Sequence, residues 1–233
     1  MDATHRPSIR LSMNDRTRQK GARFPAFLLA VFVIVVVALG VAPRYRQDWA
    51  MENVLVLLAL PLLMLGFRRL RLSNASYAAL FVFLLLHEVG AHYTYSEVPW
   101  DRWFSALSGF SLNDALGVSR NHFDRAIHFS YGLLVTPAVV ELAAARTSPR
   151  GAWRWLVPIS LMTASSALYE LFEWGAAVWF GGDLVVAYLG TQGDPWDAQQ
   201  DMFLALLGSV AAVAVLAAVA GCRRRDPREG VRH

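Results

Sequence analysis

The sequence contains little cysteine and little charge, and each shortage excludes a class of protein. Its 233 residues include one cysteine, Cys222, so a single chain can form neither an internal disulfide nor a metal site built from cysteines. Charged residues make up 17% of the chain and hydrophobic residues 55%. Soluble domains average about 25% charged and about 45–50% apolar residues. An ordinary soluble enzyme is therefore disfavoured, and a disordered chain, which needs low hydrophobicity, is excluded.

Several motifs are also missing from the sequence. It has no phosphate-binding glycine loop, no haem or flavin motif, no heptad repeat and no internal repeat. The formal net charge is +4 and the pI is near 9.6, values that in a soluble protein raise the question of nucleic-acid binding. Here the basic residues lie in the tails and in alternate loops, which is a sign of membrane topology, so we expect no nucleic-acid partner.

Long apolar runs are the main feature that the sequence does contain. A membrane helix needs about 20 mostly apolar residues. Six runs qualify, at residues 24–42, 49–67, 75–92, 121–145, 153–180 and 195–222. The first run is longer than the 7–15 apolar residues of a signal peptide, which favours a retained helix. The sequence predicts an all-α, polytopic membrane helix bundle at 24–222, with basic, disordered tails at 1–23 and 223–233.

The basic residues predict how this bundle is oriented. Cytoplasmic loops carry an excess of Lys and Arg. Most of the 22 basic residues fall in the two tails and the second and fourth loops: Arg6, Arg10, Arg16, Arg18, Lys20, Arg23, Arg68, Arg69, Arg71, Arg146, Arg150, Arg154, Arg223, Arg224, Arg225, Arg228 and Arg232. Both termini are therefore predicted to be cytoplasmic.

Given this orientation, most acids and histidines fall at the outer ends of the third to sixth spans. They are His87, Glu88, His92, Glu97, Asp101, Asp114, His122, Asp124, His128, Glu170, Glu173, Asp183, Asp194, Asp197 and Asp201. Ionisable groups inside spans are costly and usually face a bundle interior or a water-filled cavity. The pattern predicts an outward-facing pocket of carboxylates and histidines.

Asp124 and His128 open the fourth span. They are four residues apart and share one helix face. A carboxylate and an imidazole on one face can bind a metal or act as a base and its orienting partner. The alternative is structural, because Asn121 followed by Asp124 is also a helix-capping pattern.

Glu170 and Glu173 lie three residues apart in the fifth span and face the same way. An unpaired carboxylate near mid-membrane is protonated or needs a partner. A functional role and an interhelical ion pair with Arg125 both remain open.

Asp194, Asp197 and Asp201 form one stripe at the start of the sixth span. Asp194 before Pro195 fits a helix N-cap, so Asp201, one turn further in than Asp197, is the better site candidate.

The HEVGAH segment invites comparison with the zinc-protease motif, whose histidines are four residues apart. His87 and His92 are five apart, so they do not share a face, and His87 is retained as a pocket residue. The loop at 94–121 is unusually long, which favours a lid or a membrane-surface element.

The segments HEVGAHYTYSEVPW, RNHFDRAIHFSYGLL, YELFEW and YLGTQGDPWDAQQDM together resemble the YjdF-like family of bacterial inner-membrane proteins, a domain of unknown function. The resemblance covers about residues 24–221 and implies a multi-pass protein of the bacterial inner membrane. A weaker similarity is to VanZ-like proteins. Their motifs correspond here to Asp124 with His128, to Glu170 or Glu173, and to Asp201 with Gly208, but Ala205 replaces their asparagine.

Three functions follow as hypotheses. The first is a metal-dependent or acid–base site on Asp124, His128, Glu170, Glu173 and Asp201, with His87 as a further metal ligand, acting on a lipid or cell-envelope intermediate. Carboxylates with histidine suit Mg²⁺, Mn²⁺ or Zn²⁺, so a divalent metal is the candidate cofactor and membrane lipid the candidate partner. The second is a small transporter or proton relay through Glu170 or Glu173. The third is a structural or partner-binding membrane protein.

Overall fold

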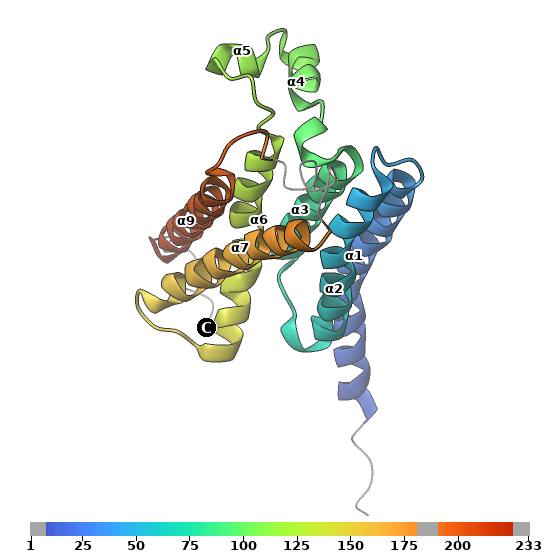
Figure 1. Ribbon diagram of the computed structural model, residues 1–233. Coiled ribbons are helices and arrows are strands. Elements are labelled where there is room, and N and C mark those ends of the chain that lie inside the picture. The colour runs from blue at the N-terminus through green and yellow to red at the C-terminus, as the bar shows by residue number, and fades with distance from the viewer. Residues whose placement is uncertain (1–7, 181–190, 226–233) are drawn as a thin grey trace, which may run out of the picture.

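The computed structural model describes residues 8–180 and 191–225 (Figure 1). In these ranges six helices are long and apolar enough to cross a membrane. They are α1 (Ser8–Gly40), α2 (Arg46–Leu70), α3 (Asn74–Tyr93), α6 (Phe123–Thr147), α7 (Trp153–Phe180) and α9 (Asp197–Arg225). Between α3 and α6 lie the short elements η1 (Tyr95–Glu97), α4 (Trp100–Ser108) and α5 (Leu112–Leu116). The predicted all-α bundle of six spans is confirmed.

Five of the six helix starts differ from the prediction. Helix α2 begins three residues early and α3 one residue early. Helix α1 begins at Ser8, so part of the tail predicted to be disordered is helical, although the apolar segment starts at Ala22. Helices α6 and α9 start two residues late, because the side chains of Asn121 and Asp194 bond backbone N–H groups two residues ahead and form turns. Asp183 and the chain at 1–7 and 226–233 lie outside the described residues.

Helix α6 occupies the middle of the bundle and packs against α3, α7 and α9 (Figure 1). Helix α3 in turn packs against α1 and α2. The outer faces of the spanning helices carry exposed apolar side chains such as Ile34, Leu65 and Val215. This arrangement suits lipid on the outside and leaves the polar side chains of α6 to face other helices.

The α6–α9 contact depends on two glycines that face each other's helix. A Cβ added at Gly132 would lie 2.0 Å from the carbonyl oxygen of Ala205, and one at Gly208 would lie 2.1 Å from that of Phe129. Small residues let membrane helices approach at backbone distance, where van der Waals packing drives association. The glycines therefore set the spacing between α6 and α9, and with it the distance between the polar residues one to two turns away.

The start of α3 is held by a carboxylate of α6. Glu141 accepts hydrogen bonds from the Ser73 N–H at 2.7 Å, the Ser73 Oγ at 2.6 Å and the Ser76 Oγ at 2.8 Å. A negative charge at a helix N-terminus also meets the positive end of the helix dipole. Glu141 is thus a structural carboxylate, and it lies at the opposite end of α6 from Asp124.

The elements α4 and α5 project beyond one end of the bundle, which we call the α4–α5 end (Figure 1). They do not fold over it as a lid. At this end α1, α3 and α7 finish and α2, α6 and α9 begin. The loops from α2 to α3 and from α6 to α7, with Arg71 and Arg150, lie at the opposite end. The connectivity therefore separates the basic loops from the acidic helix ends, as predicted.

Asp101 ties α4 to α5. Its carboxylate accepts hydrogen bonds from the Asn113 N–H and the Ser111 Oγ, both at 2.9 Å, and Ser111 is the N-cap of α5. The Asn113 N–H, with Ser111, holds the pKa of Asp101 below its usual 3.8. The contact is therefore present above the usual carboxyl pKa and is lost as the pH falls through the lowered value.

We expect Asp101→Ala to increase protease cleavage between residues 94 and 121 severalfold, because both tethers to α5 are lost. Cleavage of the wild-type protein by an acid protease should approach the rate of the variant as the pH falls below the lowered pKa. Asp114→Ala, a change in α5 itself, is the control. Equal cleavage of Asp101→Ala and Asp114→Ala would contradict the tether.

Candidate functional site

Asp124, His128 and Asp201 meet between the first turns of α6 and α9. One donor atom from each lies within 4.8 Å of the other two, and the Nε2 atom of His128 is 3.7 Å from the Oδ1 of Asp124. His128 and Asp201 are buried and Asp124 is largely so. Two donor atoms bound to the same zinc lie at most about 4.4 Å apart, which is twice the longest zinc–oxygen distance. Small side-chain rotations would therefore let these three donors bind one metal ion. They are the one such group of three in the described part of the chain.

Glu170 of α7 adds a third helix to the group. Its Oε1 lies 3.7 Å from the Nε2 of His128, and 10% of its side chain is exposed. Glu173, one turn closer to the α4–α5 end, is near enough to Glu170, Glu52 and Asp124 for their charges to interact. The two glutamates therefore face the interior, as predicted, and the negative charges of this site repel one another unless a proton or a cation intervenes.

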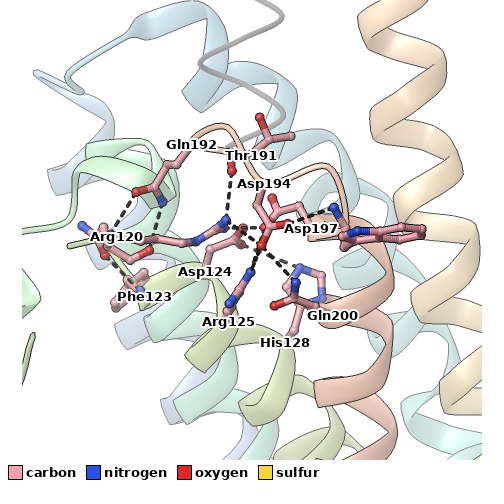
Figure 2. A network of polar contacts seen from close by, with 12 residues as sticks. Arg120, Phe123, Asp124, Arg125, His128, Thr191, Gln192, Asp194, Asp197 and Gln200 are labelled. Atoms are coloured by element: carbon pink, nitrogen blue, oxygen red, sulfur yellow. Dashed lines mark hydrogen bonds and ion pairs between the residues drawn. The ribbon is translucent and has the colours of Figure 1, made fainter. Parts of the chain in front are cut away.

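Beside this group lies a network of arginine and aspartate, shown in Figure 2. Arg125 donates to Asp194 at 2.6 Å, and Arg120 pairs with Asp197 and donates to the Thr191 carbonyl oxygen at 2.9 Å. The Arg125–Asp197 and Arg120–Asp194 pairs, at 3.6 and 3.7 Å, link the two halves. The network fastens the start of α6 to the segment that leads into α9.

The network decides two open points of the sequence analysis. Arg125 pairs with Asp194, so the predicted alternative of an Arg125–Glu170 ion pair is wrong. The reason is the helical rotation of about 100° per residue, which turns Arg125 towards α9 while Asp124 faces the interior. Asp194 is not the N-cap of α9; its carboxylate accepts from the Trp196 N–H at 2.9 Å and from Gln200 at 3.0 Å.

Charges in the network act on the groups outside the spans. The Trp196 N–H and the Arg125 guanidinium lower the pKa of Asp194. Burial, with the charges of Arg125 and Arg120, lowers the pKa of His122, which therefore stays neutral at pH 7. Both guanidiniums are thus matched to aspartates, and no arginine neutralises Asp124, Asp201 or Glu170 in the ion pairs of the described residues.

His87 lies apart from the three-residue group. The ring Nδ1 of His87 is 2.6 Å from the Tyr95 hydroxyl, whereas the Nδ1 of His92 is 2.8 Å from the Leu39 carbonyl oxygen. The two histidines of HEVGAH therefore do not converge on a zinc site, as their spacing predicts. His87 lines the cavity described below, but the described geometry does not group it with the candidate ligands.

The sequence analysis missed two buried acids of α2, Asp48 and Glu52; Glu88 of α3, which it included, is buried as well. Asp48, Glu52 and Glu88 are 3%, 5% and 0% exposed. Asp48 accepts from the Thr94 hydroxyl at 3.0 Å and Glu52 from the Tyr169 hydroxyl at 3.1 Å. The sequence could have indicated Asp48 and Glu52, because they are four residues apart at the start of a span and so share a helix face.

A cavity of about 400 Å³ lies beside Asp124 and His128. Its walls come from α2, α3, η1, α6 and α7. Asp124, His128, His87 and Tyr95 line it towards the α4–α5 end, and Val56, Leu84 and Ile127 line it with apolar surface. The hydroxyls of Tyr131 and Ser165, which also line it, lie 2.7 Å apart and link α6 to α7. The candidate site therefore opens onto an internal space.

Six spanning helices with buried carboxylates and histidines gathered at one end define a polytopic α-helical membrane protein. A family model described as "Predicted membrane protein (DUF2238)" matches residues 24–221, and the chain belongs to this family. The Inner membrane protein YjdF of Escherichia coli (strain K12) is 35% identical over 187 residues, which cover 79% of this chain and 84% of that protein. No solved structure matches the chain.

These comparisons confirm the predicted YjdF-like family and the multi-pass inner-membrane location. The similarity to VanZ-like proteins stays a prediction. Ala205, where those proteins carry asparagine, is fully buried and its carbonyl oxygen faces Gly132, so at this position the helix contact favours a small side chain.

Proposed function

We propose that this membrane protein holds a divalent metal on Asp124, His128 and Asp201 and uses it to act on a lipid or cell-envelope intermediate. The observation that carries the proposal is the meeting of these three donors, from two helices, beside a cavity. Carboxylate and imidazole donors together suit Mg²⁺, Mn²⁺ or Zn²⁺. Glu170, 3.7 Å from His128, is a fourth ligand or a general base.

The positive-inside rule supports an outward-facing site. The basic loops, with Arg71 and Arg150, lie at the end of the bundle opposite α4 and α5. Loops rich in Lys and Arg stay in the cytoplasm, so the α4–α5 end would face outwards. A metal there would polarise a substrate oxygen or lower the pKa of a bound water, while Glu170 and Glu173 move protons.

Metal analysis of the purified protein tests this function. We expect near-stoichiometric metal after exposure to Mg²⁺, Mn²⁺ or Zn²⁺ singly, measured by mass spectrometry. Asp124→Asn, His128→Gln and Asp201→Asn should each reduce it at least tenfold, because mutation of even the residues that support a ligand typically costs 10–100-fold in metal affinity.

The matched control is Glu141→Gln, which makes the same carboxylate-to-amide change on α6 at the far end of the helix. It should keep its metal. If wild-type protein binds none of the three metals, or if Asp124→Asn binds as well as wild type, the metal function is wrong.

A proton relay is the second candidate, and one observation favours it. Glu52, Glu170 and Glu173 interact electrostatically within the bundle, and the Tyr169 hydroxyl bonds Glu52. Buried carboxylates of this kind form proton pathways in transporters. Proton flux in proteoliposomes that is reduced by Glu170→Gln and Glu173→Gln, in protein without metal, would favour the relay over the enzyme.

A further inference from the structure

The cavity beside the candidate metal site opens sideways between α2 and α7. Four of its lining residues are exposed on the outer surface of the bundle: Leu55 and Ala59 of α2, and Leu168 and Phe172 of α7. All four belong to membrane-spanning segments. The mouth of the cavity therefore faces the hydrocarbon of the bilayer, and the molecules that reach it laterally are membrane lipids.

The inner wall of the cavity is buried and belongs to the middle of the bundle. Val56, Ile127, His128 and Ser166 line it and are 8% exposed or less. Helix α6, which carries Ile127 and His128, lies between α3 and α7. Lipid that merely surrounds the bundle does not reach this wall, so only a chain inserted between α2 and α7 would contact it.

Polarity changes along the cavity in the same order as in a lipid leaflet. His128 lies about 7.5 Å below the start of α6, at the depth of the head-group boundary, by a rise of 1.5 Å per residue. Asp124 and His87 line the same end. Further from that end α2 and α3 contribute Ala59 and Phe83, and the hydroxyls of Tyr131 and Ser165 bond to each other. A lipid standing upright would place its polar group at the carboxylate–histidine end and its chain in the apolar part.

We propose that the substrate of this site is a phospholipid that enters laterally between α2 and α7, with an acyl chain in the cavity and its phosphate beside Asp124 and His128. This assignment rests on the proposed metal function in one respect. The site is rich in carboxylates, and a phosphate is attracted there only when a cation offsets their charge. The insertion of the chain itself depends on the cavity alone.

Photo-crosslinking tests the entry route. The protein is reconstituted into vesicles of phosphatidylethanolamine and phosphatidylglycerol that contain a phosphatidylethanolamine with a diazirine in the upper part of one acyl chain, near the glycerol. We expect label on the buried residues Ile127 and His128 of α6, and at least fivefold less label there in Ala59→Trp, whose indole fills the mouth. Leu58→Trp is the matched control, because Leu58 is exposed on α2 but does not line the cavity.

Metal content, measured on the same samples, separates this proposal from the proposed function. Label on α6 that Ala59→Trp removes and Leu58→Trp keeps, with metal unchanged in both variants, supports lateral entry. Metal-loaded wild-type protein labelled only on exposed faces overturns lateral entry and leaves the metal function standing. Label on α6 in protein that binds no metal supports the acyl-chain site and overturns the metal function. Equal loss of label in both variants also overturns entry through this mouth.

Discussion

Gly208→Ala is expected to be among the most damaging small changes in the protein. The added Cβ would lie 2.1 Å from the Phe129 carbonyl oxygen and 2.8 Å from the Leu133 nitrogen, both backbone atoms of α6. Backbone cannot rotate away as a side chain can, so the helices must separate. Overpacking of a core costs about 1–3 kcal/mol, occasionally more, and we expect the upper end here. For a chain of this size about 3 kcal/mol lowers Tm by roughly 6–12 °C.

Two matched glycines serve as controls for this prediction. Gly221 lies on the same helix and Gly175 on α7, and a Cβ added at either meets no atom within 4 Å. Gly221→Ala and Gly175→Ala should leave the Tm in detergent unchanged or slightly raised, because alanine favours a helix over glycine. A Tm for Gly208→Ala equal to that of Gly221→Ala would refute the close α6–α9 packing.

The same variant links packing to the candidate site. Asp201 lies two turns before Gly208 on α9, and Asp124 and His128 lie on the facing helix. Helices held apart at Gly208 also separate Asp201 from its two partners. We therefore expect Gly208→Ala to lose metal together with stability, whereas Gly221→Ala keeps both.

Arg120→Met is expected to destabilise the protein by about 3 kcal/mol, because it leaves the buried Asp197 without its closest cation. The Asp197 side chain is 6% exposed, and that of Arg120 is 14% exposed. The variant also removes the donor to the Thr191 carbonyl oxygen. Breaking a buried ion pair by removing one partner costs about 3–5 kcal/mol, and we take the lower end since Arg125 remains 3.6 Å from Asp197.

The double variant Arg120→Met/Asp197→Asn distinguishes charge from packing. Most of the loss should return, because the uncompensated charge is gone. Arg102→Met, in the exposed part of α4, is the control and should leave Tm unchanged. Urea or thermal unfolding in detergent measures all three. A double variant less stable than Arg120→Met would show that the pair acts through shape and hydrogen bonding, and the electrostatic account would be wrong.

The sequence predicted the spans because hydropathy and length are properties of contiguous residues. All six helices appear, and α7 has the predicted bounds of 153 and 180. The pair Asp124 and His128 was predictable for the same reason, because residues four apart on a helix share a face. Helix starts were less predictable, since the turns at Asn121 and Asp194 use local side-chain bonds that replace the expected caps.

Pairings between helices depend on rotation and neighbours, which no local pattern specifies. The partner of Arg125 is one example. The sequence analysis proposed Glu170, but Arg125 faces α9 and pairs with Asp194. The buried acids Asp48 and Glu52 show the same limit in part. Their spacing indicates a shared face of α2, but only the fold brings them their partners, Thr94 after α3 and Tyr169 of α7.

The sequence by itself determined that this protein is a six-span membrane bundle with most of its acids and histidines at one end. The physical reason is that a helix in lipid needs a long run of apolar residues, so charged residues are rare along the runs and gather near their ends. Only the tertiary structure decided which acids pair with arginine and which remain around His128. That choice depends on the close α6–α9 approach at Gly132 and Gly208, which brings Asp201 to Asp124 and places Asp194 and Asp197 within reach of Arg125 and Arg120.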